Sequence, residues 1–143
     1  METVEHACCE GRLMARRAEH LEAVMLMRAV NGAERDWPEL RLFLAVPNGG
    51  KRGKKTAADL KAEGVRRGVP DYLFPVARGG FNGLAIELKT DTGRTSPEQR
   101  QWLADLRAHG WQAEVCRGWE QAWGVLRDYL ASDGAANDDE GGV

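Results

Sequence analysis

Apolar residues recur with a helical period in several segments, which predict amphipathic helices. A first helix is predicted over residues 13–30, with its apolar stripe at Met14, Ala18, Leu21 and Met25. A second begins at the cap sequence Ser96-Pro97-Glu98-Gln99 and ends before Gly110. The last has its stripe at Trp119, Ala122, Trp123, Leu126, Tyr129 and Leu130. Thr56 is placed to cap a shorter helix over residues 57–63.

Four short apolar runs between these helices predict β-strands. They cover residues 40–46, 71–76, 84–89 and 111–116. A Gly-rich connection joins the second and third runs, which predicts an antiparallel hairpin, whereas a helix separates the third and fourth and predicts a parallel pair. The fold class is therefore α/β, with a mixed four-stranded sheet flanked by helices.

The length of 143 residues suits one domain with one core. We expect a flexible N-terminus over residues 1–12, the folded domain over 13–130, and a disordered acidic tail over 131–143. No run approaches the roughly 20 apolar residues of a membrane span, and the first residues lack the apolar run of a secretory signal. These patterns predict a cytoplasmic protein that does not enter a membrane.

The charge is unevenly distributed along the chain. The net charge is −2, but residues 51–67 hold seven bases and two acids. Such a segment is typical of a phosphate-binding surface, and it is equally typical of a solvated loop and helix face. The three cysteines have no spacing that suits zinc.

Two charged residues interrupt the otherwise apolar strand at residues 84–89. Because side chains alternate along a strand, Glu87 and Lys89 point to the same face, and the hairpin brings Asp71 within cross-strand reach of them. Two close carboxylates share a proton or bind a cation, and oxygen ligands favour Mg²⁺ or Mn²⁺. This predicts metal-dependent hydrolysis of phosphodiesters. The alternative is structural: Asp71 caps a turn, and Glu87 and Lys89 form an ion pair on an exposed face.

These residues, taken in order, resemble the VRR-NUC (virus-type replication-repair nuclease) branch of the PD-(D/E)XK nuclease superfamily. The matching segments are PNGGKR, LKAEGVRRGVPD, GLAIELK, GRTSPEQRQWL and GWQAEVCRGWEQA. The resemblance implies a restriction-endonuclease-like αβββαβ core.

The resemblance also implies roles for individual residues. Asp71 and Glu87 would bind the metal together with the backbone carbonyl of Leu88, and Lys89 would serve the attacking water. An acid on the first helix would complete the site, either Glu19 or its neighbour Glu22.

Gln99 matches the family's helix glutamine near the site, and three residues after Ser96 it also suits a capping box. Phosphate contacts are expected from the basic and amide side chains that precede the hairpin in sequence. They are Asn48, Lys51, Arg52, Lys54, Lys55, Arg66 and Arg67.

The expected function is a Mg²⁺- or Mn²⁺-dependent endonuclease that cuts DNA, selects branched or junction structures, and acts in repair. A homodimer is expected by analogy, as is a bacterial or phage-infected host cell. Two other functions stay open, a non-catalytic nucleic-acid-binding module and a metal-dependent phosphohydrolase acting on nucleotides.

Overall fold

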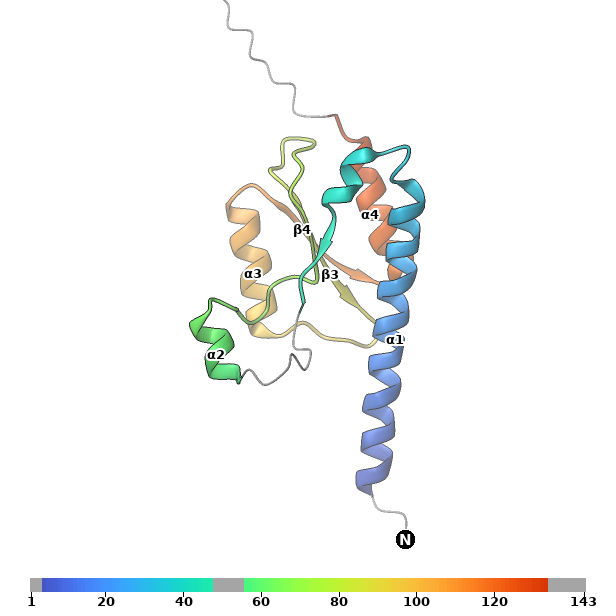
Figure 1. The fold of residues 1–143 in the computed structure, drawn as a ribbon, viewed down its shortest axis with the longest axis vertical. Helices are drawn as coiled ribbons and strands as arrows, with labels where there is room; N and C mark the ends of the chain where they lie inside the picture. Colours follow the sequence, from blue (N-terminus) through green and yellow to red (C-terminus); the bar gives the residue numbers. More distant parts are fainter. Residues whose placement is uncertain (1–3, 48–55, 134–143) are drawn as a thin grey trace, which may run out of the picture.

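The computed structural model describes residues 4–47 and 56–133, and side chains from residue 8 onward. Nine elements follow one another within these described residues (Figure 1). They are α1 (Val4–Ala33), the 3₁₀ helix η1 (Pro38–Leu42), β1 (Leu44–Ala45), α2 (Ala57–Ala62), β2 (Tyr72–Phe74), β3 (Leu84–Lys89), α3 (Pro97–Ala108), β4 (Gln112–Arg117) and α4 (Trp119–Ala131).

The four strands form one mixed sheet in the order β1-β2-β3-β4. β2 is antiparallel to both β1 and β3, and β3 is parallel to β4. The predicted hairpin and the predicted parallel pair are both confirmed, as is the α/β class with helices flanking the sheet. A close turn at the bridge between Arg78 and Phe81 ends the hairpin.

Helices cover both faces of the sheet. Figure 1 shows α3 on one side and α1 with α4 on the other. Because side chains alternate along β3, Leu84 and Ile86 pack in the larger core against α1 and α4, while Ala85 packs against Leu103 of α3. Glu87 follows Ile86 and therefore points to the α3 side. The strand carries its charged residues on the face that a single helix covers.

Local capping explains where α2 and α3 begin. In each case the N-cap hydroxyl accepts a hydrogen bond from the third residue of the helix, and the side chain of that residue accepts one from the N-cap backbone N–H. The caps are Thr56 with Asp59 and Ser96 with Gln99. Pro97 occupies the first position of α3, where no backbone donor is needed.

The first helix differs from the prediction in its start and its inward face. It begins at Val4, so residues 4–12, predicted to be flexible, are helical. The stripe predicted to face the core is wrong: Met14 is 68% exposed and Leu21 60% exposed, whereas Leu26 and Val30 are buried. Apolar residues lie all around this helix, so their period does not define one face, and contact with α4 selects the buried one.

The predicted strand over residues 40–46 is mostly a 3₁₀ helix. Only Leu44–Ala45 pairs with β2, while Pro38–Leu42 forms η1. Pro38 suits the start of a helix, and Leu40 and Phe43 are buried at a spacing of three, which is the period of a 3₁₀ turn. A run of apolar residues without alternation does not separate these two structures.

Glu22 of α1 is bound to the start of α4. Its Oε2 accepts a hydrogen bond of 2.6 Å from the backbone N–H of Trp119, the first residue of α4. Gly118, the N-cap, has no side chain for this purpose, so the carboxylate of Glu22 takes the role and also faces the positive end of the helix dipole. The contact ties α1 to α4.

Two side chains occupy the outer edge of β4. The backbone N–H of Gln112 donates to the carbonyl of Gly83 on the β3 side. Because the backbone groups of successive residues point to opposite sides of a strand, the N–H and C=O groups of Ala113 and Arg117 point away from β3. Arg107 donates to the carbonyl of Ala113, at 3.0 Å from its Nε, and Gln121 accepts from the N–H of Arg117.

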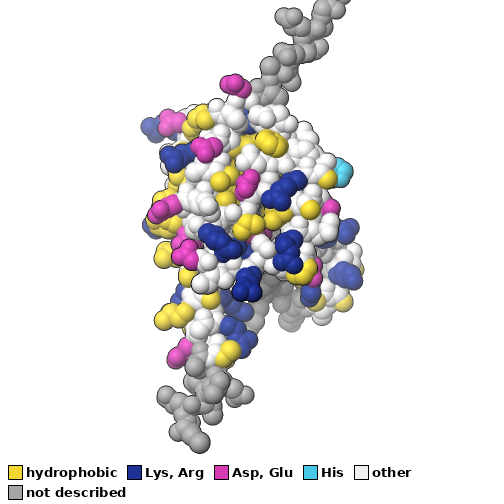
Figure 2. All heavy atoms as spheres, turned by 180° about the vertical axis from the view of Figure 1, so that it is seen from behind, with side chains coloured by type: hydrophobic (Ala, Val, Ile, Leu, Met, Phe, Trp, Pro, Cys, Tyr) yellow, Lys and Arg dark blue, Asp and Glu magenta, His cyan; other side chains and the backbone are white. Residues whose placement is uncertain are grey.

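Basic side chains are spread widely over the surface. In Figure 2, which shows the molecule from behind, Lys and Arg gather over the lower half of the described surface, with Asp and Glu along one side.

Among the described residues, every helix is too short or too polar to cross a membrane.

Candidate active site

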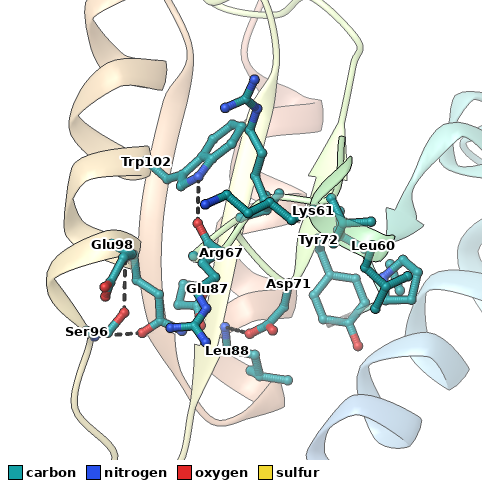
Figure 3. Close-up of a pocket in the computed structure, with 18 of the residues that line it drawn as sticks. Leu60, Lys61, Arg67, Asp71, Tyr72, Glu87, Leu88, Ser96, Glu98 and Trp102 are labelled. Atoms are coloured by element: carbon teal, nitrogen blue, oxygen red, sulfur yellow. Dashed lines mark hydrogen bonds between the residues drawn. The ribbon is translucent and has the colours of Figure 1, made fainter. Parts of the chain in front are cut away.

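An open groove of about 1390 Å³ lies where β2 begins and β3 ends (Figure 3). Its lining comes from α1, α2, the segment before β2, both strands and the first turns of α3. Four acids and four bases face it: Glu19, Asp71, Glu87, Glu98, Lys61, Arg66, Arg67 and Lys89. It therefore gathers most of the residues predicted from the sequence.

The hairpin register brings Asp71 beside the charged end of β3. Tyr72 pairs with Ile86, so the next positions on each strand, Asp71 and Glu87, are cross-strand neighbours. Asp71 Oδ2 accepts a hydrogen bond of 2.8 Å from the backbone N–H of Leu88 (Figure 3). Its own carbonyl accepts from Val46 N–H at 2.8 Å. Asp71 is thus fixed across the sheet and does not cap a turn.

Glu87 is buried, with an exposed fraction of 1%. The alternative of an ion pair on an exposed face is therefore wrong. Its Oε1 accepts a hydrogen bond of 2.7 Å from Gln99 Nε2 and lies 3.4 Å from Lys89 Nζ. Its Oε2 is buried and has no hydrogen-bond partner among the described residues. A buried carboxylate oxygen without a donor is costly, and it marks a position for a proton or a cation.

Gln99 performs both of the roles weighed for it. Its Oε1 accepts the backbone N–H of Ser96 at 2.8 Å, which completes the capping box. Because the amide oxygen is used there, the amide nitrogen must face Glu87, and it donates to Oε1. The residue that starts α3 therefore also orients the buried carboxylate.

Burial and the charge of Asp71 raise the pKa of Glu87 to about 7, and Lys89 opposes this shift. Burial, followed by the charge of Asp71, also raises the pKa of Tyr72, whose phenol therefore stays neutral beside the groove. Without a cation, the carboxylate pair favours one shared proton near neutral pH.

The two acids of α1 are separated. Glu19 is exposed and lines the groove, whereas Glu22 binds the first residue of α4. Among the side chains described, those of residues 8–47 and 56–133, no three acidic, histidine or cysteine groups stand close enough together to form a metal cluster. Glu19 thus shares the groove with Asp71 and Glu87, and its role as a third metal ligand stays a prediction.

The expected phosphate ligands are only partly described. Arg66 and Arg67 are exposed and line the groove. Asn48, Lys51, Arg52, Lys54 and Lys55 lie outside the described residues, as does the tail from residue 134. Lys61, Glu98 and Trp102 also line the groove, although no sequence pattern had marked them as site residues. Trp102 follows Gln99 by three residues, a spacing that puts both on one face of α3.

The donor set suits a hard divalent cation. Mg²⁺ is commonly held by one or two carboxylates together with water and substrate phosphate, so a third protein carboxylate is not required. Asp71 and the unpartnered Oε2 of Glu87 offer such oxygens. No nitrogen or sulfur ligand that would favour zinc accompanies them in the described part of the groove.

A mixed sheet that brings an Asp, a Glu and a Lys together at the ends of two neighbouring strands is the arrangement of a nuclease-type domain of the PD-(D/E)XK superfamily. The VRR-NUC domain model matches residues 16–120, and the chain belongs to this family. It is similar in fold to a solved structure described as a VRR_NUC domain protein, with a TM-score of 0.68 and 24% identity over 82% of this chain and 91% of that chain. No curated protein matches the sequence.

The raised pKa of Glu87 predicts how stability depends on pH in the presence of EDTA. The pKa is about 7 in the folded protein, against an ordinary value of 4.5, so the folded state binds this proton more tightly than the unfolded chain. The stabilisation is complete below pH 4.5 and is lost as pH rises to 7. Glu87→Gln has no carboxyl to titrate, so its stability relative to the wild type should rise by about 3 kcal/mol between pH 4.5 and 8.

Urea unfolding across this pH range measures the difference. Glu34→Gln, an exposed acid of the described chain outside the groove, is the control and should follow the wild type at every pH. Parallel curves for wild type and Glu87→Gln would contradict the assigned environment of Glu87.

Proposed function

We propose that this protein is a Mg²⁺- or Mn²⁺-dependent endonuclease that hydrolyses DNA by attack of water. The observation that carries the proposal is the buried Glu87, which has one oxygen held by Gln99 and the other without a donor, beside Asp71 and Lys89. A carboxylate buried only for packing would be expected to have both oxygens hydrogen-bonded. The chain is a member of a nuclease-type family, which supports the same function.

Each residue has a separate task in the proposed reaction. Asp71 and Glu87 would hold the cation, with the Leu88 carbonyl as a further ligand, and Gln99 keeps Glu87 oriented. The bound cation would polarise a phosphoryl oxygen and lower the pKa of a water. Lys89, whose ammonium lies next to the carboxylate, orients the attacking water and offsets negative charge on the phosphate.

Basic side chains around the groove support binding of a nucleic acid backbone. Lys61, Arg66 and Arg67 are exposed there, and phosphate contacts of this kind position a duplex without reading its bases. We therefore propose that the enzyme selects its DNA by shape, that its substrate is a branched or four-way structure, and that it acts in repair. A bacterial or phage-infected cytoplasm is the setting proposed for it.

A homodimer belongs to the same proposal. Two sites related by a two-fold axis suit the two strands of a symmetric junction. The exposed Met14 and Leu21, seven residues apart on α1, offer apolar surface for such a contact.

Two other functions are less well supported. A non-catalytic binding module has no use for a buried carboxylate with an unpaired oxygen. A nucleotide phosphohydrolase needs a site for one small substrate, whereas this groove is open and is lined by bases from α2 through the segment before β2.

The central test is cleavage of linear, nicked, single-stranded and four-way DNA with Mg²⁺, Mn²⁺ or EDTA. The wild type should cut at least the four-way DNA with a divalent ion and nothing in EDTA. Lys89→Ala and Asp71→Asn should each lower the rate about 100-fold or more, because each removes a group that acts in the transition state.

DNA binding by these two variants, measured by fluorescence anisotropy, should stay within a few fold of the wild type. Arg35→Ala, an exposed base outside the groove, should cut normally. Absence of cleavage of all four DNAs with both ions would overturn the proposal, and faster release of phosphate from free nucleotides than from DNA would favour the phosphohydrolase.

The two acids of α1 should respond differently to the same conservative change. Glu19→Gln should lower the cleavage rate about tenfold or more and leave thermal stability unchanged, because Glu19 is exposed in the groove. Glu22→Gln should lower the free energy of unfolding by about 1 kcal/mol, because it weakens the cap of α4, and should cut normally. If Glu22→Gln loses cleavage while Glu19→Gln keeps it, the third acid is Glu22.

The dimer is tested by sedimentation velocity at the concentrations used for cleavage. The wild type should sediment as a dimer, and Met14→Glu should shift it toward monomer by placing a charge in an apolar contact. Leu13→Glu, an exposed apolar residue of the same helix outside the stripe, is the matched control. A monomeric wild type that still cuts four-way DNA would exclude the dimer and leave the nuclease proposal intact.

A further inference from the structure

The first turn of α3 holds the segment before β2 as well as Glu87. Gly68 in this segment has a φ of +83°, and a Cβ added there would lie 2.6 Å from the carbonyl carbon of Glu98 and 2.8 Å from the backbone nitrogen of Gln99. Only glycine permits this approach and this backbone conformation together. The segment is therefore packed directly on the helix turn that supplies Gln99.

A hydrogen bond from Trp102 fixes the neighbouring peptide. Its indole Nε1 donates to the backbone carbonyl of Arg67 at 2.9 Å (Figure 3). Trp102 and Gln99 lie three residues apart on one face of α3, so two side chains of this face each donate a hydrogen bond. One holds the carboxylate of Glu87, and the other holds the main chain of Arg67.

The side chain of Arg67 is directed at the carboxylate site. Figure 3 shows it running from the segment toward Glu87 and Leu88. Arg67 is exposed, and no described side chain pairs with its guanidinium, whereas the Lys89 ammonium is already beside Glu87. Within the described groove, Arg67 is thus a cation near the carboxylates that is free to bind an incoming anionic oxygen.

We propose that Trp102 is a positioning residue, which acts through its hydrogen bond to Arg67 to set the guanidinium against the phosphate that is being cut. The inference rests on the proposed nuclease function and adds a specific task for this pair. A guanidinium held in place stabilises charge in the transition state with little reorganisation, whereas one on a loose segment binds DNA without that benefit. Loss of the indole N–H should therefore affect kcat more than KM.

The test is a double-mutant cycle in steady-state cleavage of four-way DNA. Trp102→Phe keeps an aromatic ring in the groove and removes the donor, and should lower kcat about tenfold with KM within about twofold. Arg67→Ala should lower kcat about 100-fold. The double variant should cut no more slowly than Arg67→Ala, because Trp102 acts only through Arg67.

Arg66→Ala is the matched control for charge, since Arg66 also faces the groove but its carbonyl is not held by Trp102; it should mainly raise KM. Thermal midpoints of all variants show whether folding is preserved. Trp102→Phe cutting as fast as the wild type, or slowing Arg67→Ala by a further tenfold, would overturn the inference.

The failure of this inference can be distinguished from failure of the nuclease proposal. If the wild type cuts no DNA, the nuclease proposal fails. If the wild type cuts four-way DNA and Trp102→Phe cuts it equally fast, the nuclease proposal holds and only the inference about Trp102 and Arg67 fails.

Discussion

The buried carboxylate of Glu87 is the constraint around which the site is arranged. Taking a charged group out of water costs several kcal/mol unless donors or opposite charges compensate for it. Gln99 and Lys89 compensate one oxygen, and the other is left unpaired beside Asp71. The fold thus tolerates a local cost at the end of β3, and the raised pKa of Glu87 reports that cost. A group that is stabilised only by a proton or a cation is suited to bind a metal.

Helix α3 links the folding of this region to the geometry of the site. The amide of Gln99 closes the capping box through its oxygen and orients Glu87 through its nitrogen, so the side chain that caps the helix also fixes the carboxylate. The same turn packs against Gly68 and, through Trp102, holds Arg67. One short stretch of sequence therefore sets the position of the acidic residues on one side and of a basic residue on the other.

Local signals allowed much of this structure to be predicted. The capping sequence at Ser96 and the alternation along residues 84–89 define α3 and β3, because caps and side-chain alternation act over a few residues. The inward face of α1 was predicted wrongly, since contact with α4 decides it. Likewise, the separation of Glu19 from Glu22 depends on where α4 begins, almost a hundred residues further along the chain. The pairing of Trp102 with Arg67 has no local signal, because it joins residues 35 positions apart.

The side chains of Arg107 and Gln121 occupy two backbone groups on the sheet edge that β4 forms. A strand from another molecule that added there would have to displace both before it could form its own ladder. This edge of the sheet is consequently protected against edge-to-edge pairing, a common route to aggregation. Copies of this chain that associate would not do so along β4, and the exposed faces of the helices can be altered without disturbing the strands that carry the carboxylates.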